Sequence, residues 1–145
     1  MAFSSTQNLA TYGNNLDILS DKTPSLKTYI DELQGGAFAP DAVTGTTQQA
    51  VSNGSYIPNN AGLVTITLPS VSAVGARLRV VGLGAGGWKI AQTAGQVINK
   101  SATPTTTGVG GSLASGNRYN AVELVCVIAN TTWNVASSEG TLTIV

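Results

Sequence analysis

A strict alternation of apolar and polar residues in the segment LVTITLP constrains the fold most. Val64, Ile66 and Leu68 alternate there with threonines. Successive side chains of a β-strand point to opposite faces of the sheet, so a period of two is typical of a strand with one buried face. Segment 76–81 repeats the pattern, with apolar residues on one side and two arginines on the other. The larger part of the chain is therefore predicted to consist of strands.

Further segments of this kind follow along the chain. The expected strands include 63–69, 76–81, 88–90, 96–98, 119–128, 133–135 and 142–145. Pairs such as Asn-Gly, Pro-Ser and Gly-Gly separate them and favour turns. About eight short strands at this spacing predict a mainly β domain, an antiparallel β-sandwich or barrel, over residues 43–145. Segment 122–128 is apolar on both faces, which predicts a central strand.

Residues 1–42 show a different pattern, in which apolar residues recur three and four positions apart. The residues of this stripe are Leu26, Tyr29, Ile30 and Leu33. They predict a short helix at about 24–34, preceded by a threonine cap and followed by two glycines. So short a helix is marginal alone, and we expect its stripe to pack on the β domain, on another copy of the chain or on another protein. Residues 35–47 are small and include a proline, which predicts a linker.

Charged residues are scarce, at 10% of the chain, against about a quarter in ordinary domains. Weakly charged surfaces tend to associate, so contacts with other subunits are expected. The net charge is zero, but residues 1–41 carry five acidic and two basic side chains, whereas residues 42–145 carry two acidic and five basic ones. The basic residues are scattered rather than clustered, so we expect no nucleic-acid partner.

The residue types needed for catalysis are few. The chain has no histidine, which is the commonest general base and a frequent metal ligand. Glu123 and Glu139 are the only acids of the β domain, and structural roles are expected for both rather than a catalytic pair. Cys126 lies in an apolar run and is expected to be a buried thiol. The sequence predicts a protein that is not an enzyme and holds no cofactor or metal.

The ends and apolar runs of the chain indicate no membrane segment. The first residues lack the basic region and apolar core of a signal peptide. No apolar run is long enough to span a bilayer. We therefore expect neither secretion through a signal peptide nor membrane insertion.

The segment VVGLGAGGW holds Gly82, Gly84 and Gly87 at the spacing of a dinucleotide-binding loop. Such a loop needs a helix that starts at the glycines and an acidic residue about 20 residues later. No capping residue introduces a helix here, and the first acidic residue after the glycines is Glu123. We therefore expect a tight hairpin turn, with Trp88 packed in the core or in a subunit interface.

A series of short segments stands out in the β-rich part of the chain. They are Leu68-Pro69, Ala73-Val74-Gly75, Gly87–Gln92, Gly95-Gln96, Val122–Leu124 and Thr132–Val135. Their order resembles the β-rich tip module of tailed-bacteriophage fibres and virion appendages, over residues 43–145 or about 70% of the chain. The resemblance implies a homotrimer located on the virion. Residues 1–42 have no counterpart in that module, and we expect them to attach the protein to other virion proteins.

A host-surface glycan is the ligand expected for such a module. The candidate binding residues, in polar loops, are Asn99, Lys100, Asn117, Arg118 and Tyr119. Polar side chains can hydrogen-bond sugar hydroxyls and an aromatic ring can stack on a sugar, whereas Trp88 and Trp133 are expected in the core. The expected function is that of a non-enzymatic phage structural protein, a fibre or fibre-like appendage. The alternatives are a capsid-decoration or head-fibre protein that stabilises or covers the shell, and a bacterial lectin-like module.

Overall fold

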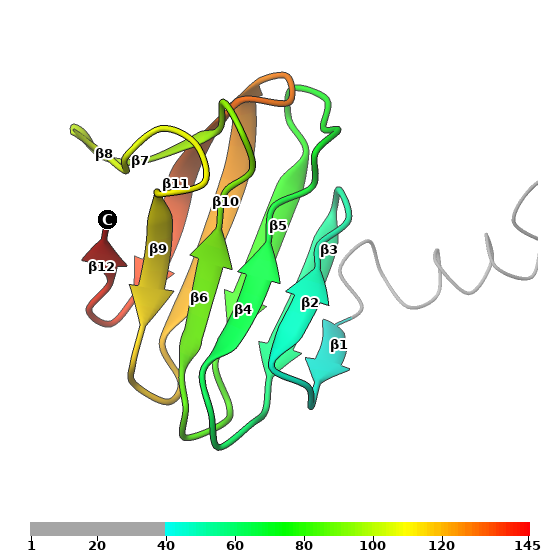
Figure 1. The fold of residues 1–145 in the computed structure, drawn as a ribbon, viewed down its shortest axis with the longest axis vertical. Helices are drawn as coiled ribbons and strands as arrows, with labels where there is room; N and C mark the ends of the chain where they lie inside the picture. Colours follow the sequence, from blue (N-terminus) through cyan, green and yellow to red (C-terminus); the bar gives the residue numbers. More distant parts are fainter. Residues whose placement is uncertain (1–39) are drawn as a thin grey trace, which may run out of the picture. The chain divides into compact units, whose positions relative to one another are not determined.

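The computed structural model describes residues 40–145, which form an all-β, sandwich-like arrangement of two sheets (Figure 1). No helix occurs within this range. The helix predicted at about 24–34 lies outside the described residues. So does its proposed oligomerisation stripe of Leu26, Tyr29, Ile30 and Leu33.

Twelve strands make up the two sheets. Sheet A contains, in spatial order, β1 (Pro40–Val43), β3 (Gly54–Pro58), β5 (Arg77–Val81), β10 (Ala121–Ile128), β11 (Thr132–Glu139), β7 (Val97–Lys100) and β8 (Thr103–Pro104). Sheet B contains β12 (Thr143–Ile144), β9 (Ser112–Ser115), β6 (Trp88–Ala91), β4 (Val64–Thr67) and β2 (Thr47–Gln49).

From β1 to β7 the chain crosses to the opposite sheet after every strand. Two crossings restore the original direction, so β1, β3 and β5 are parallel neighbours in sheet A. For the same reason β2, β4 and β6 are parallel neighbours in sheet B. Antiparallel pairing occurs where β10 joins β5 and β11, and where β9 joins β6 and β12. The expectation of antiparallel sheets is therefore wrong, and both sheets are mixed.

The strands that sequence patterning missed are short or small in side chain. β1 lies inside the segment that was interpreted as a linker, and only Val43 of this edge strand is buried. β9 has the sequence SLAS, in which a single large apolar residue gives no visible alternation. Both strands are completed by backbone hydrogen bonding to neighbours that are distant in the sequence, which a local pattern does not reveal.

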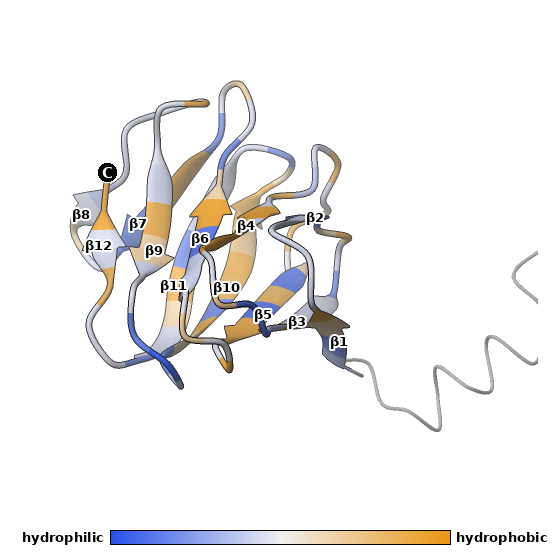
Figure 2. Cartoon of the chain, turned by 60° about the horizontal axis from the view of Figure 1, so that its bottom comes forward, coloured by the Kyte–Doolittle hydropathy of each residue, from blue (hydrophilic) through white to orange (hydrophobic). Residues whose placement is uncertain are grey.

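The core lies between the two sheets, where the apolar side chains of the alternating strands meet. Val64, Ile66 and Leu68 are fully buried, as are both tryptophans, Trp88 and Trp133. Figure 2 shows the same alternation as orange and blue bands along β5. Burial of each such side chain contributes roughly 1.5–3 kcal/mol.

The predicted central strand is confirmed, because β10 lies between β5 and β11. Val122, Leu124 and Cys126 of this strand face the core. Its other face is open, and Val127 remains exposed there. Segment 122–128 thus lies at the centre of its sheet. Although apolar residues occur on both of its faces, only one face is buried.

The loops collect at two ends of the sandwich. One end, here the valine end, is made of loops 50–53, 68–76, 92–96, 105–111 and 129–131. The other, here the glycine end, is made of loops 44–46, 59–63, 82–87, 116–120 and 140–142. Hydrogen bonds connect the loops within each end, for example Asn130 N to Ser72 O at the valine end and Tyr119 N to Gly82 O at the glycine end.

Candidate functional site

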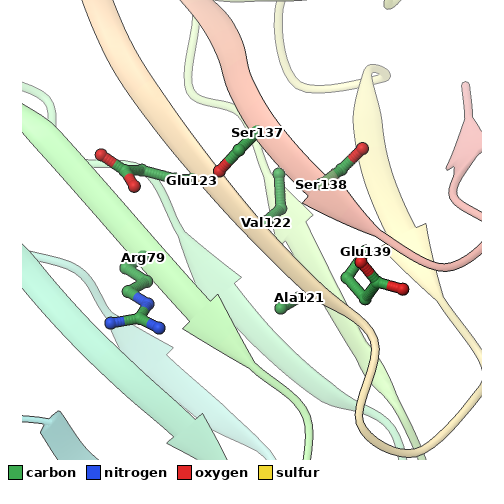
Figure 3. A pocket seen from close by; sticks show the side chains of 7 residues that line it. All are labelled: Arg79, Ala121, Val122, Glu123, Ser137, Ser138 and Glu139. Carbon is green, nitrogen blue, oxygen red and sulfur yellow. The ribbon is translucent and has the colours of Figure 1, made fainter.

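A shallow hollow lies on the outer face of sheet A, where β5, β10 and β11 run side by side (Figure 3). Its volume is about 200 Å³. The lining residues are Arg79, Ala121, Val122, Glu123, Ser137, Ser138 and Glu139. The alternation of β5 explains one wall, because Leu78 and Val80 enter the core and leave Arg79 on the outside.

A β-bulge in β11 brings the remaining groups to this face. Glu123 is paired with Ser137, but the next residue of β10 is paired with Val135, so Ala136 is the extra residue. A bulge changes the side to which the following side chains point. Val135 therefore packs against the core while Ser137, two residues later, lies opposite the outward-facing Glu123.

The charges around the hollow are paired unevenly. Glu123 lies directly opposite Arg79 in the register of β10 and β5. Its carboxylate nevertheless accepts from Arg77 Nη1 at 2.6 Å, in a diagonal ion pair. Within residues 40–145, Arg79 and Glu139 have neither an ion pair nor a side-chain hydrogen bond. Among the described residues, the hollow therefore presents one guanidinium and one carboxylate that no other side chain engages.

The two glutamates of the β domain line the same hollow. Glu139 is the last residue of β11 and immediately precedes the loop at Gly140. In Figure 3 the carboxylate of Glu123 points toward β5, whereas that of Glu139 lies on the opposite side of the hollow. The carboxylate of Glu123 is engaged by Arg77, so the two glutamates present different groups to the hollow.

The groups in the hollow fit a neutral ligand with several hydroxyls. Arg79 supplies donors only, the carboxylate of Glu139 supplies acceptors only, and serine hydroxyls act as both. A hydroxyl group can meet all three. The two arginines and two glutamates around the hollow cancel in charge, so it has no net preference for an anion or a cation. In the described part of the chain, no three His, Cys, Asp or Glu side chains gather as a metal site would require.

Three of the predicted ligand-binding residues lie in the β9–β10 loop at the glycine end. These are Asn117, Arg118 and Tyr119. Arg118 Nε donates to Leu83 O at 3.0 Å, and its guanidinium carbon is 5.5 Å from the ring centroid of Tyr119. This is within cation–π distance. The exposed Tyr119 ring is therefore partly covered by its own neighbour, and the hollow described above does not include it.

The other two predicted residues, Asn99 and Lys100, lie in a strand. β7 extends to Lys100, and the turn follows at Ser101, which has a φ of 55°. Asn99 Nδ2 donates to Asn134 Oδ1 at 2.9 Å, across to β11. The placement of these two residues in a loop was wrong, because the strand continues for two residues into the polar run and the turn begins only at Ser101.

The five predicted residues do not form one site. Asn99 is aligned through Asn134 with Val125, whereas Tyr119 precedes the start of β10 at the glycine end. The strand from Ala121 to Val125 covers about 14 Å along the sheet. The hollow lies between these places, and sequence reasoning missed it. The sequence pattern did indicate the outward-facing arginines of β5 and the acidic Glu123 of β10. It did not indicate the bulge in β11 that adds the serines and the second glutamate to the hollow.

The glycine-rich segment is not a nucleotide-binding loop. It joins β5 in sheet A to β6 in sheet B, and in the described chain no helix starts there. It is also not a hairpin turn, because its flanking strands lie in different sheets. A Cβ at Gly84 would collide with the backbone of Asn60, and Gly87 has a φ of 69°. The glycines therefore allow two loops to touch and the chain to cross between the sheets.

Trp88 and Cys126 have the core positions that were expected for them. Trp88 follows the glycines, is fully buried and donates from Nε1 to Asn120 O at 3.0 Å. Burial raises the pKa of the Cys126 thiol, and backbone hydrogen bonding to Asn130 and Ile128 opposes this rise. The thiolate is the reactive form of cysteine. The buried thiol is therefore expected to be unreactive in the folded protein.

Comparison with known proteins adds no assignment. No family model matches the chain, and no curated protein matches it. Residues 40–145 contain no helix of the length and apolarity that a membrane span requires.

Proposed function

We propose that this protein is a non-enzymatic structural protein of a phage virion, a homotrimeric fibre or fibre-like appendage. Residues 1–42 attach it to other virion proteins, and the β domain is exposed to the host surface. The sequence resemblance supports this role. Its most characteristic residues include Trp88, Gln92, Gln96 and Trp133, all buried in the sandwich. Buried residues of this kind are expected to determine the fold, whereas residues on the surface determine which ligand is bound.

The hollow between β5, β10 and β11 carries the binding part of the proposal. Its volume of about 200 Å³ is smaller than the roughly 300–1,000 Å³ of pockets for drug-sized molecules. A single sugar ring of a host glycan suits this size. Arg79, Ser137 and Glu139 supply the donors and acceptors for neighbouring sugar hydroxyls. An open, shallow site of this kind favours weak binding, which several copies of one appendage strengthen together.

A glycan array with the full-length protein tests this proposal. Wild-type protein is expected to bind a subset of neutral bacterial glycans, and Arg79→Ala is expected to lose at least about ten-fold in apparent affinity, the loss of one good hydrogen bond to a charged group. Lys89→Ala is the matched control, because it removes one positive charge from the outer side of sheet B. Retention of binding by Arg79→Ala would remove the hollow from the proposal. Absence of binding by wild-type protein to any glycan or to host cells would contradict host adhesion.

The exposed aliphatic residues of the valine end favour a second candidate, a capsid-decoration or head-fibre protein. Val71 and Val74 project from loop 68–76 and remain largely exposed, and apolar surface of this kind marks protein contacts. Such a protein would bind purified heads and would not adsorb to cells. A fibre would adsorb to cells. Sedimentation of labelled protein with purified heads and with host cells distinguishes the two.

A further inference from the structure

The outer face of sheet A continues beyond the hollow along β10 and β11. Glu123 of β10 lines the hollow, and Val125 is the next outward-facing residue of the same strand. On β11, Ser137 lines the hollow, and Asn134 faces outward on the other side of the bulge, paired with Val125. Successive outward positions along one strand are about 7 Å apart. The surface next to the hollow is therefore built from the same two strands.

Two asparagine side chains are joined on this surface. Asn134 of β11 is aligned with Asn99 of the neighbouring strand β7, and Asn99 Nδ2 donates to Asn134 Oδ1 at 2.9 Å. Among residues 40–145, the other polar atom of each side chain, Asn99 Oδ1 and Asn134 Nδ2, has no hydrogen-bond partner. We refer to the two residues as the amide pair. It presents one acceptor and one donor group, and less side-chain entropy is lost on binding because the amides already hold each other.

Val125 provides an apolar floor beside the amide pair. In the register of sheet A it lies between Arg77 of β5 and Asn134 of β11, and it is half-buried. Arg77 is itself held in place by its ion pair with Glu123. Binding sites for small molecules combine apolar surface with a few oriented polar groups in this way. A sugar ring has CH groups on its face and hydroxyls around its rim, which matches an apolar floor with polar borders.

The hollow and the amide pair together are longer than one sugar ring. Glu139, at one end of the hollow, is aligned with Ala121, whereas Asn134 is aligned with Val125. The strand from Ala121 to Val125 covers about 14 Å along the sheet. A single ring does not bridge this span, but two or three linked rings do. The two places therefore fit successive rings of one ligand.

We propose that the ligand is a neutral oligosaccharide that lies along β10, with one ring in the hollow and a following ring on Val125 beside the amide pair. Asn99 and Asn134 are then specificity-determining residues, because their amides bond hydroxyls of the following ring. The inference rests on the proposed function and extends its binding site. An extended peptide fits less well, because β10 and β11 are internal strands and offer no free edge for backbone pairing.

The dependence of affinity on ligand length tests this extension. Titration calorimetry of the full-length protein would use the glycan that the array selects and its fragments of one, two and three rings. Asn134→Ala is expected to weaken binding of the three-ring fragment about five-fold, as the loss of one hydrogen bond would, and to leave binding of the ring in the hollow unchanged. Arg79→Ala is expected to weaken binding of every fragment. Asn59→Ala is the matched control, because Asn59 is also an exposed asparagine but lies in the connection between β3 and β4.

The outcomes separate this inference from the proposed function. Loss of binding in Arg79→Ala but not in Asn134→Ala, for any fragment, overturns the extension and leaves the hollow as the site. An equal loss in Asn134→Ala for one-ring and three-ring fragments also overturns it, because a general disturbance of the sheet would have that effect. Absence of glycan binding by wild-type protein overturns both. Thermal unfolding checks that each variant is folded.

Discussion

The valine end and the glycine end of the sandwich each join five loops, but they do so through different groups of the chain. At the glycine end the loops touch through backbone, and Gly84 lies directly against Asn60. At the valine end, backbone hydrogen bonds such as Asn130 N to Ser72 O are supplemented by buried side chains, chiefly the amides of Gln92 and Gln96.

The two solutions leave different surfaces. Backbone contact at the glycine end leaves no space for a side chain at Gly84. The exposed residues of this end include Leu63, Leu83 and the charged Arg118 against Tyr119. Amide side chains at the valine end satisfy the backbone from inside and leave the tips of the loops to valine and isoleucine. The glycine end therefore stabilises the fold through close contact of its loops, whereas the valine end stabilises it through buried amides and leaves aliphatic side chains exposed.

The largest effect is expected at the glycine end from Gly84→Val. A Cβ there would meet the backbone of Asn60, which cannot move aside as a flexible side chain would. The expected result is loss of folded protein, or a fall of at least about 3 kcal/mol in the free energy of unfolding. Urea denaturation measures it. Gly116→Val is the control from the same end, where an added Cβ meets nothing within 4 Å. Equal stability of both variants would remove the distinction between close-packed and open glycines.

A smaller effect is expected at the valine end from Gln96→Leu. The substitution removes the acceptor for Thr93 N and the donor to two carbonyls, Pro69 O and Asn130 O. Leaving buried polar groups unpaired costs about 1–3 kcal/mol each, and partial relaxation should bring the total loss to about 2–3 kcal/mol. The midpoint and slope of urea denaturation give the value. Gln49→Leu, which alters an exposed amide that bonds Thr67 O, should cost less than about 1 kcal/mol. A loss at position 96 no greater than at position 49 would refute the structural role of the network.

The two tryptophans allow a matched comparison of two buried sites. Trp88 begins β6 at the glycine end and donates to Asn120 O, whereas Trp133 Nε1 is buried with no hydrogen-bond partner in residues 40–145. Changing either to phenylalanine removes similar volume, but only Trp88→Phe breaks a hydrogen bond. Trp88→Phe is expected to be less stable than Trp133→Phe by about 1 kcal/mol. Each variant keeps one tryptophan, whose fluorescence reports unfolding. The opposite order of stability would show that Trp133 has a partner.

The smallest effect is expected on the open face between the two ends. Arg77→Ala removes the ion pair with Glu123, whose 2.6 Å contact lies at the surface with 53% of the arginine side chain exposed. Exposed ion pairs typically contribute 0 to about 1 kcal/mol, because solvent screens them. The expected change in the free energy of unfolding is within about 0.5 kcal/mol and should shrink further in high salt. Thermal unfolding at low and high salt measures it. A larger, salt-independent loss would mean that Arg77 contributes through packing.

Much of the core could be predicted from the sequence. Leu78 and Val80 alternate with arginines, so one face of their strand is apolar. The hydrophobic effect drives that face into the core. The burial of Cys126 follows from its apolar run in the same way. The hollow could not be predicted, because it depends on the register of three strands and on the bulge at Ala136.

By itself, the sequence determined which side chains of the alternating strands enter the core and where several of the turns lie. Those properties follow from a local period of two and from local backbone preferences. Only the tertiary structure decided that β1 to β7 alternate between sheets, which makes their sheet neighbours parallel. The same turn residues occur whether the next strand pairs with the one before it or crosses to the opposite sheet. The choice depends on contacts between residues far apart in the chain, such as Asn60 with Gly84 and Gln96 with Asn130, and these exist only once the sandwich has formed.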